Sequence, residues 1–199
     1  SYTNAPYRDD FKIYFVFAFD CGIGGEMRDR GCQKTESVGV YLDSRRYTVR
    51  IATSYISEEQ AMLNLRRETE GKTYEEIESF AVSAWEELLS RVKIRAVEQV
   101  MHTFYSCMYR AFVFPNRFYE TDACGKNIHI DPETLTVKDG VAYTNNGFWD
   151  TYRTVYPFYS LVIPEKLNEI IEGFLNLYDD RGVLPRWPTP SEFNCMPGT

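Results

Sequence analysis

Several patterns that would indicate common functions are absent or scarce in this sequence. Histidine occurs only twice, at His102 and His129, which is too few for a typical zinc site within the chain. No apolar run approaches the roughly 20 residues of a membrane-spanning helix, so the sequence predicts no such span. The glycines of residues 22–25 lack the Lys-Ser/Thr of a phosphate loop. A net charge of −7 disfavours binding to nucleic acid.

The composition is that of a folded globular protein with an excess of aromatic residues. Apolar residues make up 44% and charged residues 26% of the 199 positions, so we expect one domain or two small ones rather than disorder. Aromatic residues reach 16%, and their broad faces suit hydrophobic cores and sugar rings equally well. Cys21 and Cys32 flank a glycine-rich stretch, which leaves open a local disulfide.

The N-terminal part of the chain has the hydrophobic pattern of β-strands. Residues 11–19 are apolar on both faces, as in a buried strand. Residues 21–34 carry several glycines and charges, which predict a long loop. Two further strands are predicted over 38–42 and 47–53, joined by a hairpin turn at 43–46. Three consecutive strands favour the end of an antiparallel sheet or sandwich.

After Ser54 the apolar residues recur at the helical period of about 3.6. Capping boxes at Ser57–Gln60 and Thr73–Glu76 predict the starts of two helices. A third helix is predicted over residues 98–114, where Pro115 ends it.

The C-terminal part of the chain predicts irregular structure and then two more helices. Residues 118–144 read as irregular, with a short hairpin around residues 139–140. A fourth helix is predicted from about Phe148, and Pro157 should kink or end it. Pro164 is suited to begin a fifth helix, with Gly182 just after its end.

Two tryptophans and one carboxylate are the strongest candidates for binding. An acidic residue such as Asp150 is favoured near a helix N-terminus, where it could pair with Arg153 while Trp149 packs in a core. Alternatively, a sugar ring stacks on the indole while the carboxylate accepts hydrogen bonds from two adjacent hydroxyls. Trp187 stands between two prolines, a rigid frame that suits either ligand binding or the filling of a gap between helices.

Several longer strings, in their order along the chain, resemble the motifs of one enzyme family. They are Ser54–Ser57 with Gln60-Ala61 and Asn64-Leu65, Phe104-Tyr105 with Met108-Tyr109-Arg110 and Pro115, Asn146–Pro157, Gly182–Pro188 and Asn194–Thr199. Together they cover nearly all of the chain, and they are similar to strings of glycoside hydrolase family 92.

The resemblance implies a mixed fold. Family members pair an N-terminal β-sandwich with a C-terminal (α/α)6 barrel. Residues 1–54 would be the C-terminal strands of the antiparallel β-sandwich domain, residues 55–115 the connecting helices, and residues 116–199 the first helices of the (α/α)6 barrel. Because most of such a barrel would then be missing, we expect the chain to be an internal piece of a larger protein.

The resemblance also implies an activity. The family consists of calcium-dependent exo-α-mannosidases that invert configuration. We therefore expect a part of a secreted, periplasmic or cell-surface enzyme, with a signal peptide upstream, that hydrolyses α-mannosidic bonds, mainly α-1,2, of N-glycans or yeast mannan. Its partners would be α-mannoside glycans and the rest of its own polypeptide. The alternatives are a non-catalytic carbohydrate-binding or scaffold protein and a helical interaction domain.

Finally, the resemblance assigns candidate site residues. The family's catalytic acid, catalytic base and calcium ligands map beyond this chain, so we expect no catalytic and no metal-binding residue here, and no activity from the chain alone. The mannose pocket maps in part onto the chain, and we take Trp149, next to the mapped carboxylate, as a further candidate. The candidate substrate-binding residues are Asp150, Trp149, Trp187, Asn194, Cys195 and Met196.

Overall fold

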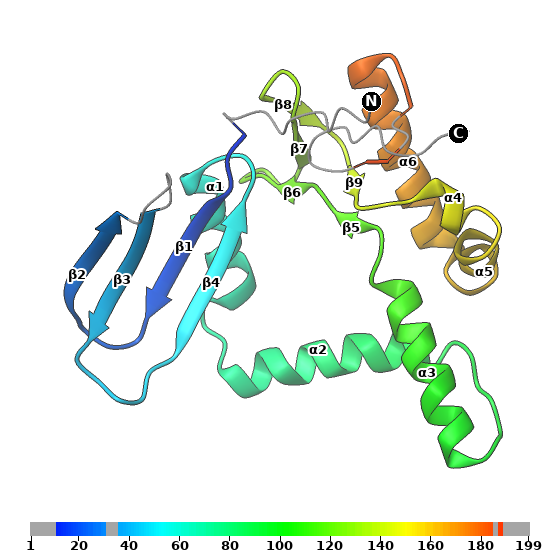
Figure 1. Ribbon diagram of the computed structural model, residues 1–199, viewed down its shortest axis with the longest axis horizontal. Helices are drawn as coiled ribbons and strands as arrows, with labels where there is room; N and C mark the ends of the chain where they lie inside the picture. Colours follow the sequence, from blue (N-terminus) through cyan, green and yellow to red (C-terminus); the bar gives the residue numbers. More distant parts are fainter. Residues whose placement is uncertain (1–10, 31–35, 185–186, 189–199) are drawn as a thin grey trace. The chain divides into compact units, whose positions relative to one another are not determined.

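The computed structural model describes residues 11–30, 36–184, 187 and 188. The chain divides into two compact units, which we call the ribbon unit, Tyr14–Glu70, and the helical unit, which contains the described residues from Gly71 onward (Figure 1). Within the described ranges, no helix combines the length and the apolar character needed to cross a lipid bilayer.

Two antiparallel strand pairs form the ribbon unit's backbone. The strands are β1 (Tyr14–Phe19), β2 (Ile23–Arg30), β3 (Glu36–Leu42) and β4 (Val49–Ser54). β1 pairs with β4, and β2 pairs with β3. Between the two pairs, the Thr48 amide donates to Asp20 Oδ1 at 2.7 Å and the Asp43 amide donates to the Gly22 carbonyl at 3.2 Å. The segment from β1 to β2 therefore runs antiparallel to the segment from β3 to β4 as one long ribbon.

This pairing corrects two sequence predictions. The predicted loop over 21–34 is wrong for residues 23–30, which form β2, because backbone pairing with β3 stabilises a strand that its glycines disfavour. The predicted hairpin at 43–46 is also wrong, since β3 and β4 pair with different partners. Cys21 carries a free thiol, and Cys32 lies outside the described residues.

Helix α1 (Glu58–Thr69) covers one face of the β1–β4 pair. The small core of this unit consists of Val16, Ala61 and Leu65, with Tyr14, Ala18, Ala52 and Met62 packed against it. On the other face of the pair, Phe15, Phe17 and Ile51 are each more than half exposed. Since α1 belongs to this unit, the unit extends past Ser54, where the hydrophobic period changes.

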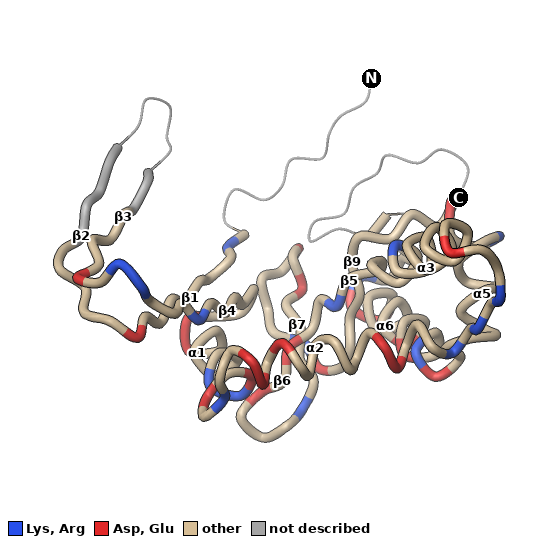
Figure 2. The backbone as a smooth tube through the Cα atoms, turned by 90° about the horizontal axis from the view of Figure 1, so that it is seen from below, with Lys and Arg blue, Asp and Glu red and all other residues tan. Residues whose placement is uncertain are grey.

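The start of α1 follows the predicted capping box in its first half only. Ser57 Oγ accepts a hydrogen bond from the Gln60 amide at 3.1 Å, as expected of an N-cap. The Gln60 side chain, however, donates to Asn64 Oδ1, while the Ser57 amide donates to Ser54 Oγ. Acidic residues occupy the first turn of α1 and basic residues its last turn, as the helix dipole favours (Figure 2).

The helical unit contains the remaining elements. Its helices are α2 (Tyr74–Leu89), α3 (Glu98–Phe112), α4 (Phe148–Thr151), α5 (Val155–Val162) and α6 (Pro164–Arg181), and its strands are β5 (Asn116–Arg117), β6 (Glu120–Thr121), β7 (Asn127–Asp131), β8 (Thr136–Asp139) and β9 (Tyr143–Thr144). β5 pairs with β9, and β6, β7 and β8 form a three-stranded sheet.

The region predicted to be irregular therefore contains a small sheet. Its tight hairpin joins β7 to β8 through residues 132–135, so the hairpin predicted around 139–140 is wrong. Asp131 forms this turn because its carboxylate accepts bonds from the Glu133 amide at 3.0 Å and the Thr134 hydroxyl at 2.6 Å.

The predicted helix boundaries are confirmed at α2 and α6. Thr73 and Glu76 form the complete capping box that the sequence predicts. Pro164 is the first residue of α6, and Gly182 ends it in the left-handed conformation with φ of 74°. The break attributed to Pro157 falls earlier, between α4 and α5, and Pro157 lies in the first turn of α5, where its missing amide costs no hydrogen bond.

Helix α6 packs closely on the segment that contains β9. Its buried face carries Ile170, Phe174 and Leu177. Gly173 permits the approach, because a Cβ there would lie 2.8 Å from the Tyr143 ring and 3.3 Å from the Ala142 Cα. This contact fixes the loop that leads from β9 into α4.

Candidate functional site

A cavity of about 400 Å³ lies at the start of α4, within the size range of small-molecule sites. The described residues that line it are Phe114, Asn145, Asn146, Gly147, Asp150, Thr151 and Trp187.

The Pro188 carbonyl anchors the tryptophan segment to the loop before α4. It accepts hydrogen bonds from the Asn145 amide at 2.6 Å, the Thr144 hydroxyl at 3.2 Å and the Asn146 amide at 3.4 Å. Trp187 is therefore positioned by backbone contacts to residues more than forty positions earlier in the chain.

Gly147 brings the indole and the carboxylate together. A Cβ at this position would lie 2.6 Å from Trp187 Cζ3 and 3.2 Å from Asp150 Oδ2. Any side chain here would push the two groups apart. With glycine, both groups are within reach of one small ligand.

The Asp150 carboxylate is open to a ligand. It accepts no hydrogen bond from the described side chains, and the Arg153 guanidinium instead lies over the Tyr152 ring, 4.9 Å from its centroid. The ion pair between Asp150 and Arg153 that the sequence left open is thus not formed. The carboxylate can accept hydrogen bonds from neighbouring hydroxyls of a bound molecule.

Asn146 supplies a buried amide to the same cavity. Its side chain is 1% exposed, and its Oδ1 accepts a hydrogen bond from the Tyr156 hydroxyl at 2.7 Å. Burial raises the pKa of Tyr156, so this hydroxyl stays protonated as the donor. The Asn146 Nδ2 is buried and has no hydrogen-bond partner among the residues that the structure describes.

Comparison with known proteins identifies the family. Residues 60–199 match the Glycosyl hydrolase family 92 catalytic domain. The chain belongs to glycoside hydrolase family 92. Among curated protein sequences, none matches it.

Solved structures of family 92 members share the fold. The structure of a family 92 inverting mannosidase from Bacteroides thetaiotaomicron VPI-5482 is 33% identical, with a TM-score of 0.88, over 100% of this chain and 29% of that one. An α-mannosidase of the family from Bacteroides thetaiotaomicron, in complex with mannoimidazole, is 24% identical, with a TM-score of 0.79, over 92% and 27%. The family 92 chain described here thus spans less than a third of the length of these relatives.

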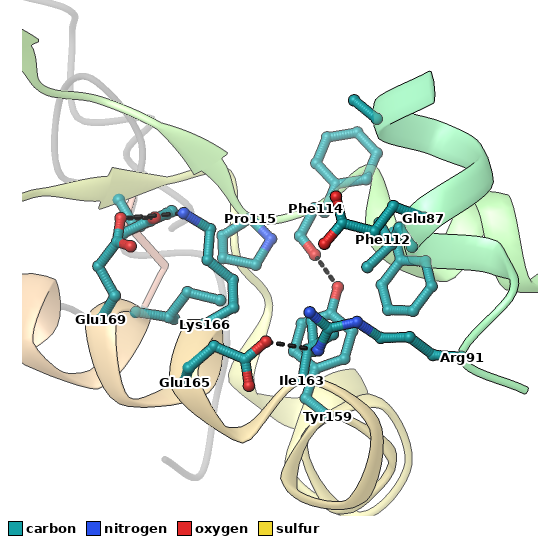
Figure 3. Close-up of a pocket in the computed structure, with 14 residues that line it drawn as sticks. Glu87, Arg91, Phe112, Phe114, Pro115, Tyr159, Ile163, Glu165, Lys166 and Glu169 are labelled. Atoms are coloured by element: carbon teal, nitrogen blue, oxygen red, sulfur yellow. Dashed lines mark hydrogen bonds and ion pairs between the residues drawn. The ribbon is translucent and has the colours of Figure 1, made fainter. Parts of the chain in front are cut away.

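The family 92 chain has a second, more charged cavity of about 450 Å³ (Figure 3). Arg91, at the end of the α2 segment, forms an ion pair with Glu165 and donates to the Val162 carbonyl at 3.0 Å. Lys166 Nζ lies 2.9 Å from Glu169 Oε1. The charged side chains of these two pairs are thus neutralised within the chain itself.

Glu169 is the most strongly perturbed carboxylate of this second cavity. Burial alone would raise its pKa, but hydrogen bonds from Tyr119, Tyr143 and Lys166 outweigh burial and lower the pKa to about 2. Burial and the hydrogen bond to Glu169 also raise the pKa of Tyr119 to about 12. The network fastens α6 to the strands beside it.

The two histidines lie away from both cavities' linings. His129 is buried in β7, where the sequence indicates a loop, and its Nε2 lies 2.8 Å from Asp180 Oδ2. Its Nδ1 lies 3.1 Å from the Gly140 carbonyl oxygen. His102 is exposed on α3. The described ranges contain no group of three or more His, Cys, Asp or Glu side chains placed to hold a metal ion.

The structure brings only part of the predicted site together. Asp150 and Trp187 both line the first cavity, whereas Trp149 is 57% exposed and absent from the lining. Successive helical residues point about 100° apart, so neighbours rarely face one cavity. Substrate binding by Trp149 stays a prediction. Asn194, Cys195 and Met196 lie outside the described residues.

Five of the lining residues have no role in the sequence-based predictions: Phe114, Asn145, Asn146, Gly147 and Thr151. Asn146 and Gly147 are inside a family string, but nothing in their own pattern distinguishes a cavity wall from a helix N-terminus. Phe114 lies beside the helix-ending Pro115 and far from the other residues in the sequence. The bonds to the Pro188 carbonyl and the pairing of β5 with β9 show that these segments meet.

Proposed function

We propose that this chain is part of an exo-acting α-mannosidase that hydrolyses α-mannosidic bonds with inversion. The observation that carries the proposal is the cavity in which the open Asp150 carboxylate and the Trp187 indole meet around Gly147. In a family 92 chain, this combination suits a pyranose ring. A relative that is 33% identical is described as an inverting mannosidase, which supports the reaction class.

In this proposal Asp150 binds substrate and Trp187 shapes its pocket. The carboxylate accepts hydrogen bonds from two sugar hydroxyls, and such charge-assisted bonds are about twice as strong as neutral ones. The indole offers its apolar face to the C–H side of the ring, with little conformational freedom to lose on binding. The chain's own residues thus bind and orient the non-reducing mannose.

The catalytic groups are proposed to lie in the rest of a longer polypeptide. An inverting glycosidase needs an acid that protonates the leaving oxygen and a base that activates water, with carboxyl groups about 6.5–9.5 Å apart. Calcium, which the family resemblance implies, does not fit the described residues, since they place no three suitable ligands together. We therefore assign no calcium ligand to this chain.

The proposed domain organisation follows from the same relationship. Residues 1–54 would end a β-sandwich, and the exposed Phe15, Phe17 and Ile51 are the apolar face that a second sheet would cover. Residues 55–115 would connect it to an (α/α)6 barrel that starts with residues 116–199. The protein would be secreted, periplasmic or on the cell surface. Its substrates would be N-glycan or yeast-mannan chains, with α-1,2 bonds preferred.

The test is the activity of the full-length enzyme. We expect it to release mannose from α-1,2-mannobiose faster than from the α-1,3 and α-1,6 isomers, with β-mannose as the first product by NMR, and to lose activity with a calcium chelator. The 199-residue chain alone should release none. Tight binding of mannosides by the full-length protein without hydrolysis would instead indicate a carbohydrate-binding protein.

A further inference from the structure

We propose that Asn146 is a specificity-determining residue whose side-chain amide donates a hydrogen bond to one hydroxyl of the sugar bound at Asp150. The inference rests on the proposed function and deepens it. Asp150 can only accept hydrogen bonds when ionised, whereas Asn146 supplies a buried amide donor to the same cavity.

The first observation is an unsatisfied donor. Asn146 lines the cavity and is 1% exposed, and its buried Nδ2 finds no acceptor in the described part of the chain. A buried donor without an acceptor costs free energy, and native proteins retain few such groups. An oxygen atom of a molecule bound in the cavity would satisfy it. Because Nδ2 is screened from bulk water, the resulting hydrogen bond would be stronger than on an open surface.

The second observation is that Asn146 is held in one orientation. The Tyr156 hydroxyl donates to Oδ1 at 2.7 Å, which leaves only the NH₂ end of the amide for another partner. The backbone amide of Asn146 points to the Pro188 carbonyl at 3.4 Å, next to Trp187. The donor is therefore pre-positioned by two contacts that do not involve a ligand.

Donor, acceptor and aromatic ring together define a chemical class. A sugar hydroxyl that accepts a hydrogen bond from Asn146 can itself donate a hydrogen bond to the Asp150 carboxylate. A neighbouring hydroxyl of the same sugar can donate that bond instead. A substrate that lacks the hydroxyl at this position leaves the amide unpaired again, and sites of this kind discriminate strongly against such analogues. The cavity should therefore recognise one particular hydroxyl through Asn146.

The experiment compares substrates that differ by one hydroxyl. In the full-length enzyme, kcat/KM is measured on an aryl α-mannoside and on each of its monodeoxy analogues. Asn146→Ala should lower kcat/KM on the parent substrate about 10- to 100-fold. On one monodeoxy analogue the same change should cost less than about threefold, because the lost bond is already absent. Calorimetric binding of methyl α-mannoside is measured in parallel.

Three further variants sharpen the comparison. Asn146→Asp keeps the shape but replaces the donor with a negative charge near Asp150, so it should lose more than Asn146→Ala. Tyr156→Phe should show the same analogue pattern with a smaller loss, since the amide keeps its donor but loses its orientation. Asn168→Ala, an exposed asparagine on α6, is the matched control and should stay within about twofold of wild type.

The outcomes separate this inference from the proposed function. Equal losses on all analogues, or no loss, would overturn the role of Asn146 while mannoside hydrolysis by the wild type stands. A wild-type protein that binds methyl α-mannoside without turnover would overturn the proposed hydrolase alone, and the same variant series would then be scored on binding. Absence of both binding and turnover overturns both.

Discussion

Phe114 lines both of the cavities described above, yet these two cavities differ in how their polar groups are satisfied. In the larger one, Arg91, Glu165, Lys166 and Glu169 are paired with one another or with nearby tyrosines. In the smaller one, the Asp150 carboxylate and the Asn146 Nδ2 have no partner in the described part of the chain.

The comparison shows why charge alone is a poor guide to a ligand site. A strongly shifted pKa often marks a functional residue, but ion-pair networks shift pKa values as well. The pKa of Glu169 is lowered to about 2 because the protein already supplies its hydrogen-bond donors. A site for a neutral polyhydroxyl ligand instead needs groups whose hydrogen bonds are still to be made.

The largest expected effect comes from the open carboxylate. Asp150→Ala in the full-length enzyme removes two charge-assisted hydrogen bonds to substrate. The transition state should therefore lose several kcal/mol of binding free energy, and kcat/KM should fall about 100- to 10,000-fold. Steady-state kinetics should show that the plot of kcat/KM against pH keeps its shape at lower values, since a residue that only binds substrate transfers no proton.

Two matched variants test this prediction. Asp150→Asn keeps the size of the side chain and should recover part of the lost activity, while Asp179→Ala removes an exposed carboxylate from α6 and should have little effect. Loss of one limb of the pH profile in Asp150→Ala would make Asp150 a proton-transfer residue. Full activity would mean that the smaller cavity is not the mannose site.

The next effect concerns the meeting of the indole and the carboxylate. Gly147→Ala would place a methyl group 2.6 Å from the Trp187 ring, so the ring must shift and KM should rise about tenfold or more. Gly24→Ala is a control that gains only an ordinary contact of 3.7 Å, to the Tyr41 carbonyl. Unchanged kinetics in Gly147→Ala would show that substrate does not use the position of Trp187.

Changes in the larger cavity, called the paired cavity because Arg91, Glu165, Lys166 and Glu169 are paired there, should affect stability rather than activity. The folded pKa of Glu169, about 2, lies below its ordinary value of 4.5, so its stabilising contribution is present above pH 4.5 and is lost between pH 4.5 and 2. Glu169→Gln should lower the melting temperature at neutral pH, and the difference from wild type should shrink as the pH falls through that window. Glu172→Gln, on the exposed side of α6, should show no such trend.

The smallest effect is expected at the rim of the paired cavity. The side chains of Arg91 and Glu165 are 35% and 60% exposed, and pairs of this kind contribute at most about 1 kcal/mol. Arg91→Gln should therefore lower the melting temperature by only a few degrees, and by less at high salt. A large loss would show that the hydrogen bond to the Val162 carbonyl, rather than the ion pair, fixes this corner.

Local signals predicted the helices better than the strands. Thr73 with Glu76, and Pro164 with Gly182, determine helix ends through contacts a few residues away, so the sequence shows them directly. The partner of β1 is β4 rather than the next strand along the chain, and no local pattern encodes that choice. Gly24 and Gly25, which indicated a loop, lie instead in β2.

The candidate site divides in the same way. Asp150 and Trp187 were found because each stands in a recognisable string, one from the helix start and one between prolines. The sequence did not predict a role for the Asn146 amide, because that role depends on its contact with the Tyr156 hydroxyl and on its place in the cavity wall. The bonds from Tyr119 and Tyr143 to Glu169 are equally invisible in sequence, since they join positions 50 and 26 residues apart.

The long ribbon of the smaller unit has a consequence for the order in which that unit folds. Asp20 and Thr48 are 28 positions apart, and the entropy cost of closing a loop grows with its length, by about 0.6 kcal/mol for each doubling. The bridge between Arg30 and Glu36 closes a much shorter loop. We therefore expect β2 and β3 to pair first and β1 and β4 to pair next. Helix α1 would pack on the β1–β4 pair only after that. The pairing of β2 with β3 would in this way control how fast the core beneath β1 and β4 forms.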